Sequence, residues 1–162
     1  MIRDAEPRDL VRIMAFWAPM VRDSMVTFSS EPKGLHDLHA MLEDRRAKGR
    51  GFLVAEVDGV VAGFASYDQF RGGNGYAHSM EHTIILDAPA RGRGLGRALL
   101  NAICDHGAAA GAHVMMAGVS GGNAQGVAFH AACGFTEVAR VPQVGRKFDQ
   151  WWDLVLMQRM LS

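Results

Sequence analysis

A predicted β-hairpin constrains the fold of this chain more than any other segment. Two apolar runs, residues 52–57 and 60–66, flank the dipeptide Asp58-Gly59. Asp-Gly favours the tight two-residue turn that joins antiparallel strands. We therefore expect two antiparallel strands here, and a third strand of the same sheet over residues 76–86, after a glycine-rich loop.

Helical and extended patterns alternate through the rest of the chain. An amphipathic helix is predicted from Asp9 and is interrupted at Pro19, because proline removes a backbone donor. Further helices are expected over residues 34–48, from residue 97 to about 110 and over 123–133, and strands over 2–3, 114–119, 135–140 and 151–160. With 162 residues, 49% of them hydrophobic, this order predicts one α/β domain over residues 1–162, with a mixed, mostly antiparallel central sheet and helices on both faces.

Charge and composition argue against several kinds of partner. The 17 basic residues balance the 17 acidic ones, so no global field favours nucleic acid or an anionic membrane. No apolar run approaches the ~20 residues of a membrane span, and the start lacks the apolar core of a signal peptide. We therefore expect a cytoplasmic protein, in which Cys104 and Cys133 give no disulfide framework.

The segment Arg91-Gly-Arg-Gly-Leu-Gly96 stands between a predicted strand and a predicted helix. Backbone N–H groups at a helix start have no intrahelical partner and converge on anions, so we expect a phosphate here. A Walker loop is excluded because Arg97-Ala98 replaces Lys-Ser or Lys-Thr, and Leu99 weakens a dinucleotide fingerprint. A glycine-rich turn that merely caps a surface helix stays open as the alternative.

The spacing of Arg91, Gly94 and Gly96 resembles the pyrophosphate loop of the GNAT superfamily of N-acetyltransferases. Other segments are similar to its phosphinothricin and methionine-derivative acetyltransferase branch. They are Phe28 with Glu31-Pro32, Glu81-His82-Thr83, residues 114–118, Asn123, residues 130–135, 142–151 and 153–158. The resemblance covers nearly the whole chain.

This resemblance implies acetyl-CoA as cosubstrate, a small amino-acid substrate and a homodimer. It also implies that the strands before and after the loop splay apart, with the pantetheine arm in the gap. The cofactor-binding residues would be Ile84, Ile85, Leu86, Arg91, Gly92, Arg93, Gly94, Leu95, Gly96, Arg97 and Asn123. Asn123 would touch the cofactor arm, with a plain helix N-cap as the alternative.

Acetylation of an amine needs a base, an oxyanion site and a proton for the thiolate. Glu81 is the candidate base, because it lies on the strand that leads into the loop, and partial burial would raise its pKa towards the working range. Backbone N–H groups at 84–86 would meet the oxyanion. His130 occupies the slot where many superfamily members carry a Tyr, and we leave open whether it donates a proton or is structural.

The predicted substrate residues are Arg71, as a carboxylate clamp, and Phe28, Tyr76 and His82, as walls. The branch often has a further Arg after Arg71, whereas residues 72–77 read Gly-Gly-Asn-Gly-Tyr-Ala, which leaves the substrate open. Methionine sulfoximine or sulfone and phosphinothricin are the natural candidates. A basic and aromatic group would border the pocket, a dimer contact or the core: Lys147, Phe148, Trp151 and Trp152.

Other functions fit less well. Gly118-x-Ser120-x-Gly122 matches a nucleophile elbow, but no acid followed by a His comes after Ser120, so a hydrolase triad cannot be built. On a strand, His78 and His82 face away from Glu81, so no metal is expected. The remaining rivals are a non-catalytic acyl-CoA sensor, which needs neither Glu81 nor Arg71, and an acetyltransferase for another small amine or a peptide N-terminus.

Overall fold

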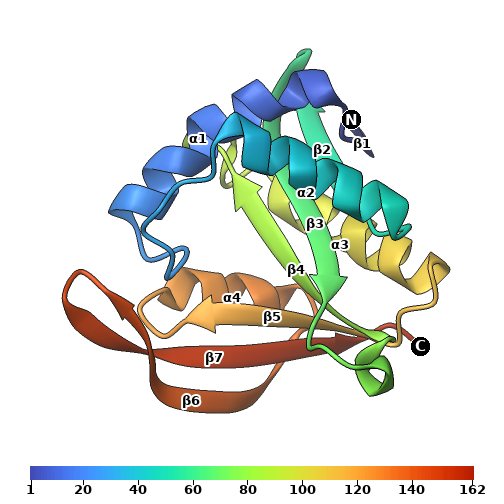
Figure 1. The fold of residues 1–162 in the computed structure, drawn as a ribbon. Helices are drawn as coiled ribbons and strands as arrows, with labels where there is room; N and C mark the ends of the chain where they lie inside the picture. Colours follow the sequence, from blue (N-terminus) through green and yellow to red (C-terminus); the bar gives the residue numbers. More distant parts are fainter.

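The structure is a computed structural model that describes residues 1–162 (Figure 1). Its strands are β1 (Ile2–Asp4), β2 (Phe52–Val57), β3 (Val60–Gln69), β4 (Ser79–Leu86), β5 (Val114–Ser120), β6 (Thr136–Lys147) and β7 (Gln150–Met160). Its helices are α1 (Leu10–Asp23), α2 (Leu35–Ala47), α3 (Leu95–Ala109) and α4 (Ala124–Ala132), with 3-10 turns at Pro7–Asp9, Asn74–Tyr76 and Ala88–Ala90. None of these helices is long and apolar enough to cross a membrane.

The strands form one seven-stranded sheet in the order β1-β2-β3-β4-β5-β7-β6. Every neighbouring pair is antiparallel except β4 and β5, which are parallel. The predicted hairpin is confirmed as β2 and β3, and both Asp58 and Gly59 have positive φ, as a two-residue turn of this kind requires. The mixed, mostly antiparallel sheet expected from the sequence is therefore confirmed.

Helices cover both faces of the sheet, because side chains alternate along each strand. Phe52 and Val54 of β2 pack with α1 and α2 on one face, whereas Leu53 and Ala55 join the core with α3 on the other. Figure 1 shows α1 and α2 together on one face of the sheet, with α3 behind it. The sheet thus has one apolar core on each face, and both cores include a residue of β4, Met80 in one and Ile85 in the other.

Four predicted boundaries differ from the structure by three residues or more. The strand predicted to end at residue 66 continues to Gln69, because it pairs with β4 as far as Met80. The first helix continues through Pro19 to Asp23, because Val21 remains buried in the core and outweighs one lost hydrogen bond. The third strand begins at Ser79, not at Tyr76, because Asn74–Tyr76 form a 3-10 turn. The strand predicted to end at Arg140 continues to Lys147, because it pairs with β7 across two register shifts.

The parallel pair β4 and β5 opens into a gap. Only Ser79, Met80 and Glu81 of β4 pair with β5, and the pairing stops at the contact of Glu81 with Met116. Beyond that point the two strands diverge (Figure 1). The splay that the family resemblance implied is thus present, and Glu81 lies at its vertex.

Candidate active site

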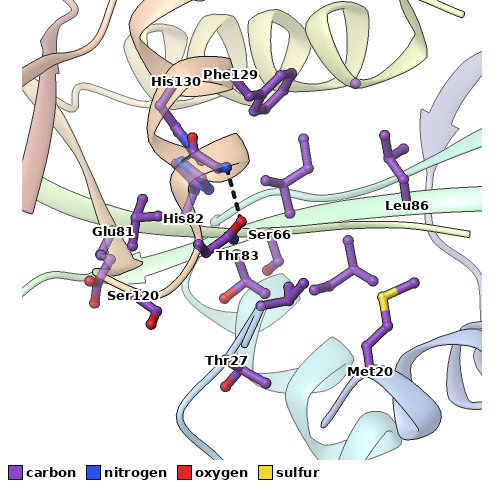
Figure 2. A pocket seen from close by; sticks show the side chains of 18 of the residues that line it. Met20, Thr27, Ser66, Glu81, His82, Thr83, Leu86, Ser120, Phe129 and His130 are labelled. Carbon is purple, nitrogen blue, oxygen red and sulfur yellow. Dashed lines mark hydrogen bonds between the residues drawn. The ribbon is translucent and has the colours of Figure 1, made fainter. Parts of the chain in front are cut away.

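A cleft of about 950 Å³ fills the gap between β4 and β5. It runs from Glu81 at one end towards Leu86, with His130 and Phe129 of α4 on one side and Thr27 and Met20 on the other (Figure 2). Its volume lies in the range of small-molecule and cofactor sites. The cleft therefore connects the predicted base with the predicted phosphate loop.

Glu81 is half-buried at the vertex and forms no ion pair. Burial raises the pKa of its carboxyl group. The carboxylate lies over Gly118 of β5, where an added Cβ would be 2.9 Å from Oε2. The absence of a side chain at position 118 therefore provides the space that Glu81 occupies.

The glycine-rich segment has the geometry of an anion site. Gly92 and Gly94 both have φ of 78°, and an added Cβ would meet nothing within 4 Å at either position. The first bond of α3 is Ala98 N–H to Gly94 O at 3.1 Å, so the amides of residues 95–97 have no backbone acceptor. Arg91 and Arg97 line the cleft beside them, whereas Arg93 and Leu95 do not line it.

Gly96 differs from Gly94. A Cβ at position 96 would lie 3.0 Å from a Leu86 side-chain carbon and 3.2 Å from the Phe129 ring. Gly96 is therefore needed for the close packing of α3 against β4 and α4, and Gly94 for the left-handed turn in front of the helix.

Every second backbone N–H group of β4 points into the gap, and the others point towards β3. The Asp87 N–H bonds to Ala62 O at 2.8 Å, and amide directions alternate along a strand. Ile85 therefore directs its N–H towards β3, whereas Ile84 and Leu86 direct theirs towards the side that β5 has left. Among the three amides predicted to meet the oxyanion, Ile84 and Leu86 are the two available ones.

His130 and His82 form a buried stacked pair on the α4 side of the sheet, with Nε2 atoms 3.2 Å apart. The Nδ1 of His130 lies 2.7 Å from Gly126 O, so it carries the proton and donates to that carbonyl. Burial lowers the pKa of His130, and burial together with the His130 charge lowers the pKa of His82 to about 3. Both rings are neutral near pH 7, and His82 donates its Nε2 proton to His130.

Asn123 has the position of the N-cap of α4, and its Oδ1 accepts from the Gly126 N–H at 3.0 Å. The same residue lines the cleft. Both interpretations of Asn123 from the sequence are compatible with this position.

The structure places two of the four predicted substrate residues at the cleft and two away from it. Phe28 and His82 line the cleft. Arg71 and Tyr76 do not line it; they are exposed and stack on each other, with the guanidinium carbon 5.8 Å from the ring centroid. Their roles remain predictions.

Sequence reasoning missed several residues at the Glu81 end of the cleft. Asp68 is the direct cross-strand partner of Glu81 and forms ion pairs with Arg45 and Arg50. Asp68 lies beyond residue 66, where its strand was predicted to end, so the sequence did not indicate its pairing with Glu81. Arg45 comes from α2 and carried no local pattern that points to a cleft.

Ser120 is buried, and its Oγ accepts from the Gly122 N–H at 3.0 Å. No group of three or more His, Cys, Asp or Glu side chains is arranged to hold a metal ion.

The sheet has a single parallel strand pair, whose strands separate beside a helix with free N-terminal amides, and a carboxylate lies where they separate. This is the architecture expected of a GNAT-type acetyltransferase. The sequence profile of the Acetyltransferase (GNAT) family matches residues 17–135. The chain belongs to the GNAT acetyltransferases.

Three relatives show how close the similarity is. The L-methionine sulfoximine/L-methionine sulfone acetyltransferase of Salmonella typhimurium is 35% identical over 99% of this chain and 94% of its own length. A phosphinothricin acetyltransferase of Sinorhizobium meliloti, solved in complex with acetyl-CoA, is 29% identical with a TM-score of 0.95, over 100% of this chain and 88% of that one. A ribosomal-protein-alanine N-acetyltransferase of Brucella melitensis is 37% identical with a TM-score of 0.95, over 99% of both chains.

Proposed function

We propose that this protein transfers the acetyl group of acetyl-CoA directly to the α-amine of a small amino acid, with Glu81 as general base. The observation that carries the proposal is the position of Glu81. This half-buried carboxylate without a cation partner stands where β4 and β5 part, next to the two β4 amides that face the gap.

The glycine-rich segment fits the diphosphate of the cosubstrate. Unpaired amides at residues 95–97, the open left-handed turn at Gly94 and the cationic side chains of Arg91 and Arg97 surround one end of the cleft. When bound, acetyl-CoA supplies the thioester. An arm that extends from this loop between β4 and β5 would reach Glu81.

The protein's own groups have separate tasks in this proposal. Glu81 takes the proton of the substrate ammonium group, and its raised pKa makes it a stronger base than an exposed carboxylate. The amides of Ile84 and Leu86 donate to the carbonyl oxygen as negative charge develops on it. For His130 the geometry favours the structural role, because both ring nitrogens are already engaged.

The relatives suggest the substrate class. Methionine sulfoximine, methionine sulfone and phosphinothricin are amino-acid analogues, and proteins similar to this chain are named for acetylating them. The Brucella relative keeps a peptide N-terminus open as an alternative. Arg71 stays our candidate for the carboxylate contact, and a cytoplasmic homodimer stays our prediction for the assembled protein.

Release of free CoA, followed with a thiol reagent, tests the proposed function. The panel contains L-methionine sulfoximine, L-methionine sulfone, phosphinothricin and an alanyl peptide, each with acetyl-CoA. We expect amine-dependent release with at least one amino acid, and a fall of about 100-fold or more in Glu81→Gln. Binding of acetyl-CoA without any release would favour the non-catalytic sensor, and full activity in Glu81→Gln would remove Glu81 from the mechanism.

A further inference from the structure

Lys147, at the end of β6, is buried although lysine is almost never found fully buried without a partner. Its Nζ donates to Ser24 O and to Thr27 O, each at 2.6 Å. Burial lowers the pKa of this ammonium group, and the Asp23 carboxylate opposes that shift. The buried ammonium group therefore binds two carbonyl groups that are more than a hundred residues away in the chain.

Both carbonyl groups belong to the wall segment, which we define as residues 24–29 after the end of α1. Val26, Thr27, Phe28 and Ser29 of this segment line the cleft. The segment has no helix or strand of its own, and its internal bonds are short-range contacts such as Ser29 N–H to Thr27 Oγ1 at 3.1 Å. Its position must therefore be set by what it packs against.

The β6–β7 hairpin supplies a further contact to the wall segment at Gly145, and Trp152 and Met25 both border Gly122. The Phe28 ring lies on Gly145 of β6, so closely that a Cβ at position 145 would be 2.6 to 2.7 Å from three ring carbons. The Trp152 ring lies over Gly122 near the Met25 methyl group, and its Nε1 donates to Lys147 O at 2.9 Å. In Figure 1 the connection between α1 and α2 descends from the helical layer towards this hairpin.

These contacts adjoin the Glu81 end of the cleft. The space above Gly118 is bounded both by Glu81 and by Leu154 of β7, at 3.5 Å from an added Cβ. Trp152 precedes Leu154 by two residues and so projects from the same face of β7. The wall segment and Glu81 thus line the same cleft, and side chains of β7 border the two glycines beside them.

We propose that Lys147 and Gly145 are positioning residues that determine amine specificity, because through them the β6–β7 hairpin fixes the wall segment against the Glu81 end of the cleft. The proposal rests on the proposed function for its kinetic consequences. It assigns Lys147 no contact with either substrate.

Two substitutions test the Lys147 hydrogen bonds and the packing of Phe28 on Gly145 separately. Lys147→Met keeps the length of the side chain and removes its donors, so the wall segment should loosen. We expect the KM for the amine to rise about tenfold, equivalent to about 1.4 kcal/mol, with little change in kcat and in acetyl-CoA affinity. Gly145→Ala keeps the strand and pushes the Phe28 ring towards the cleft, so it should raise the KM of a bulky amine more than that of a small one.

The matched control is Lys33→Met, the same change at an exposed lysine shortly beyond the wall segment. A double-mutant cycle with Phe28→Ala tests the route of the Gly145→Ala effect, which should vanish when the ring is absent. If Lys147→Met does not fold, Gly145→Ala and its cycle with Phe28→Ala test the position of the wall segment without a substitution at Lys147.

Hydrogen exchange of residues 24–29 supplies a readout that does not need turnover. We expect faster exchange in Lys147→Met and unchanged exchange in Lys33→Met. If the wild-type protein acetylates no amine, the proposed function is wrong. Hydrogen exchange would still test whether Lys147 holds the wall segment in place. The proposal is overturned if exchange is unchanged, if the amine and acetyl-CoA constants shift together, or if the Gly145→Ala effect survives in Phe28→Ala.

Discussion

Glu81 combines burial with the lack of a cation partner, and this has a consequence for stability. Its folded pKa lies above the unfolded value, so the stability that it contributes is complete below the unfolded pKa and is lost as pH rises through the folded one. We predict that Glu81→Gln gains stability relative to the wild type as pH rises from 4 to 8. Denaturant unfolding of both proteins across that range measures the difference, and a constant difference would contradict the raised pKa.

Gly118 offers a second test at the residue scale. In Gly118→Ala the new Cβ would meet Oε2 of Glu81, and the flexible carboxylate can move aside at low cost. We predict nearly unchanged thermal stability and acetyl-CoA affinity, with turnover reduced by about 10- to 100-fold through misplacement of the base. Unchanged turnover would show that the position of the carboxylate over Gly118 is not the catalytic one.

The buried histidine pair predicts acid sensitivity. The folded pKa values of His82 and His130 lie below the ordinary value, so the stability that they contribute is present above about pH 6.5 and is lost as pH falls. Each histidine adds up to about 1.4 kcal/mol per pH unit to the slope. His82→Phe should reduce the slope of the unfolding free energy below pH 6.5, whereas exposed His36→Gln should not; equal slopes would argue against a neutral pair.

For single residues, the sequence indicated candidate chemical roles more readily than it indicated which residues lie at the cleft. Local pattern led to Glu81 and the loop glycines, and the family resemblance led to Asn123; all of them line the cleft, while their tasks stay predictions. Arg45 and Asp68 could not be predicted, because their place in the cleft depends on α2 and on strand register. From the sequence, Lys147 could border the pocket, form a dimer contact or lie in the core. Its actual position could not be predicted, because only the fold brings it to Ser24 and Thr27.

Among the elements, the start of α3 makes two different demands on its glycines. Gly94→Val should weaken acetyl-CoA binding about tenfold or more, since it strains a left-handed residue and fills the open face of the loop. Gly96→Val should instead cost about 1–3 kcal/mol of stability, because it overpacks Leu86 and Phe129. Calorimetric titration and thermal unfolding of both variants separate the effects, and the reverse pattern would be contrary to this assignment.

Elements with strong local patterns could be predicted from the sequence, and elements that depend on partners could not. The β2–β3 hairpin follows from its Asp-Gly turn. The length of β6 depends on β7, which continues the pairing as far as the contact of Lys147 with Gln150. Pro19 is tolerated within α1 because burial of that helix outweighs a local rule.

On the scale of the whole molecule, one parallel strand pair in an otherwise antiparallel sheet creates the cleft. Its two strands pair over only three residues and then leave backbone amides free, with helices on both faces to close the gap. The order of strands and helices in the sequence predicts a mixed sheet, and the α3 crossover between β4 and β5 accounts for its one parallel pair. The extent of the splay is a property of packing alone.

A crystal structure of the protein with coenzyme A tests the central claim most directly. We predict that the diphosphate lies against the amides of residues 95–97, within about 3.2 Å of their nitrogen atoms, and that the pantetheine arm runs between β4 and β5 towards Glu81. Coenzyme A bound at another surface, or with its thiol directed away from Glu81, would contradict the account.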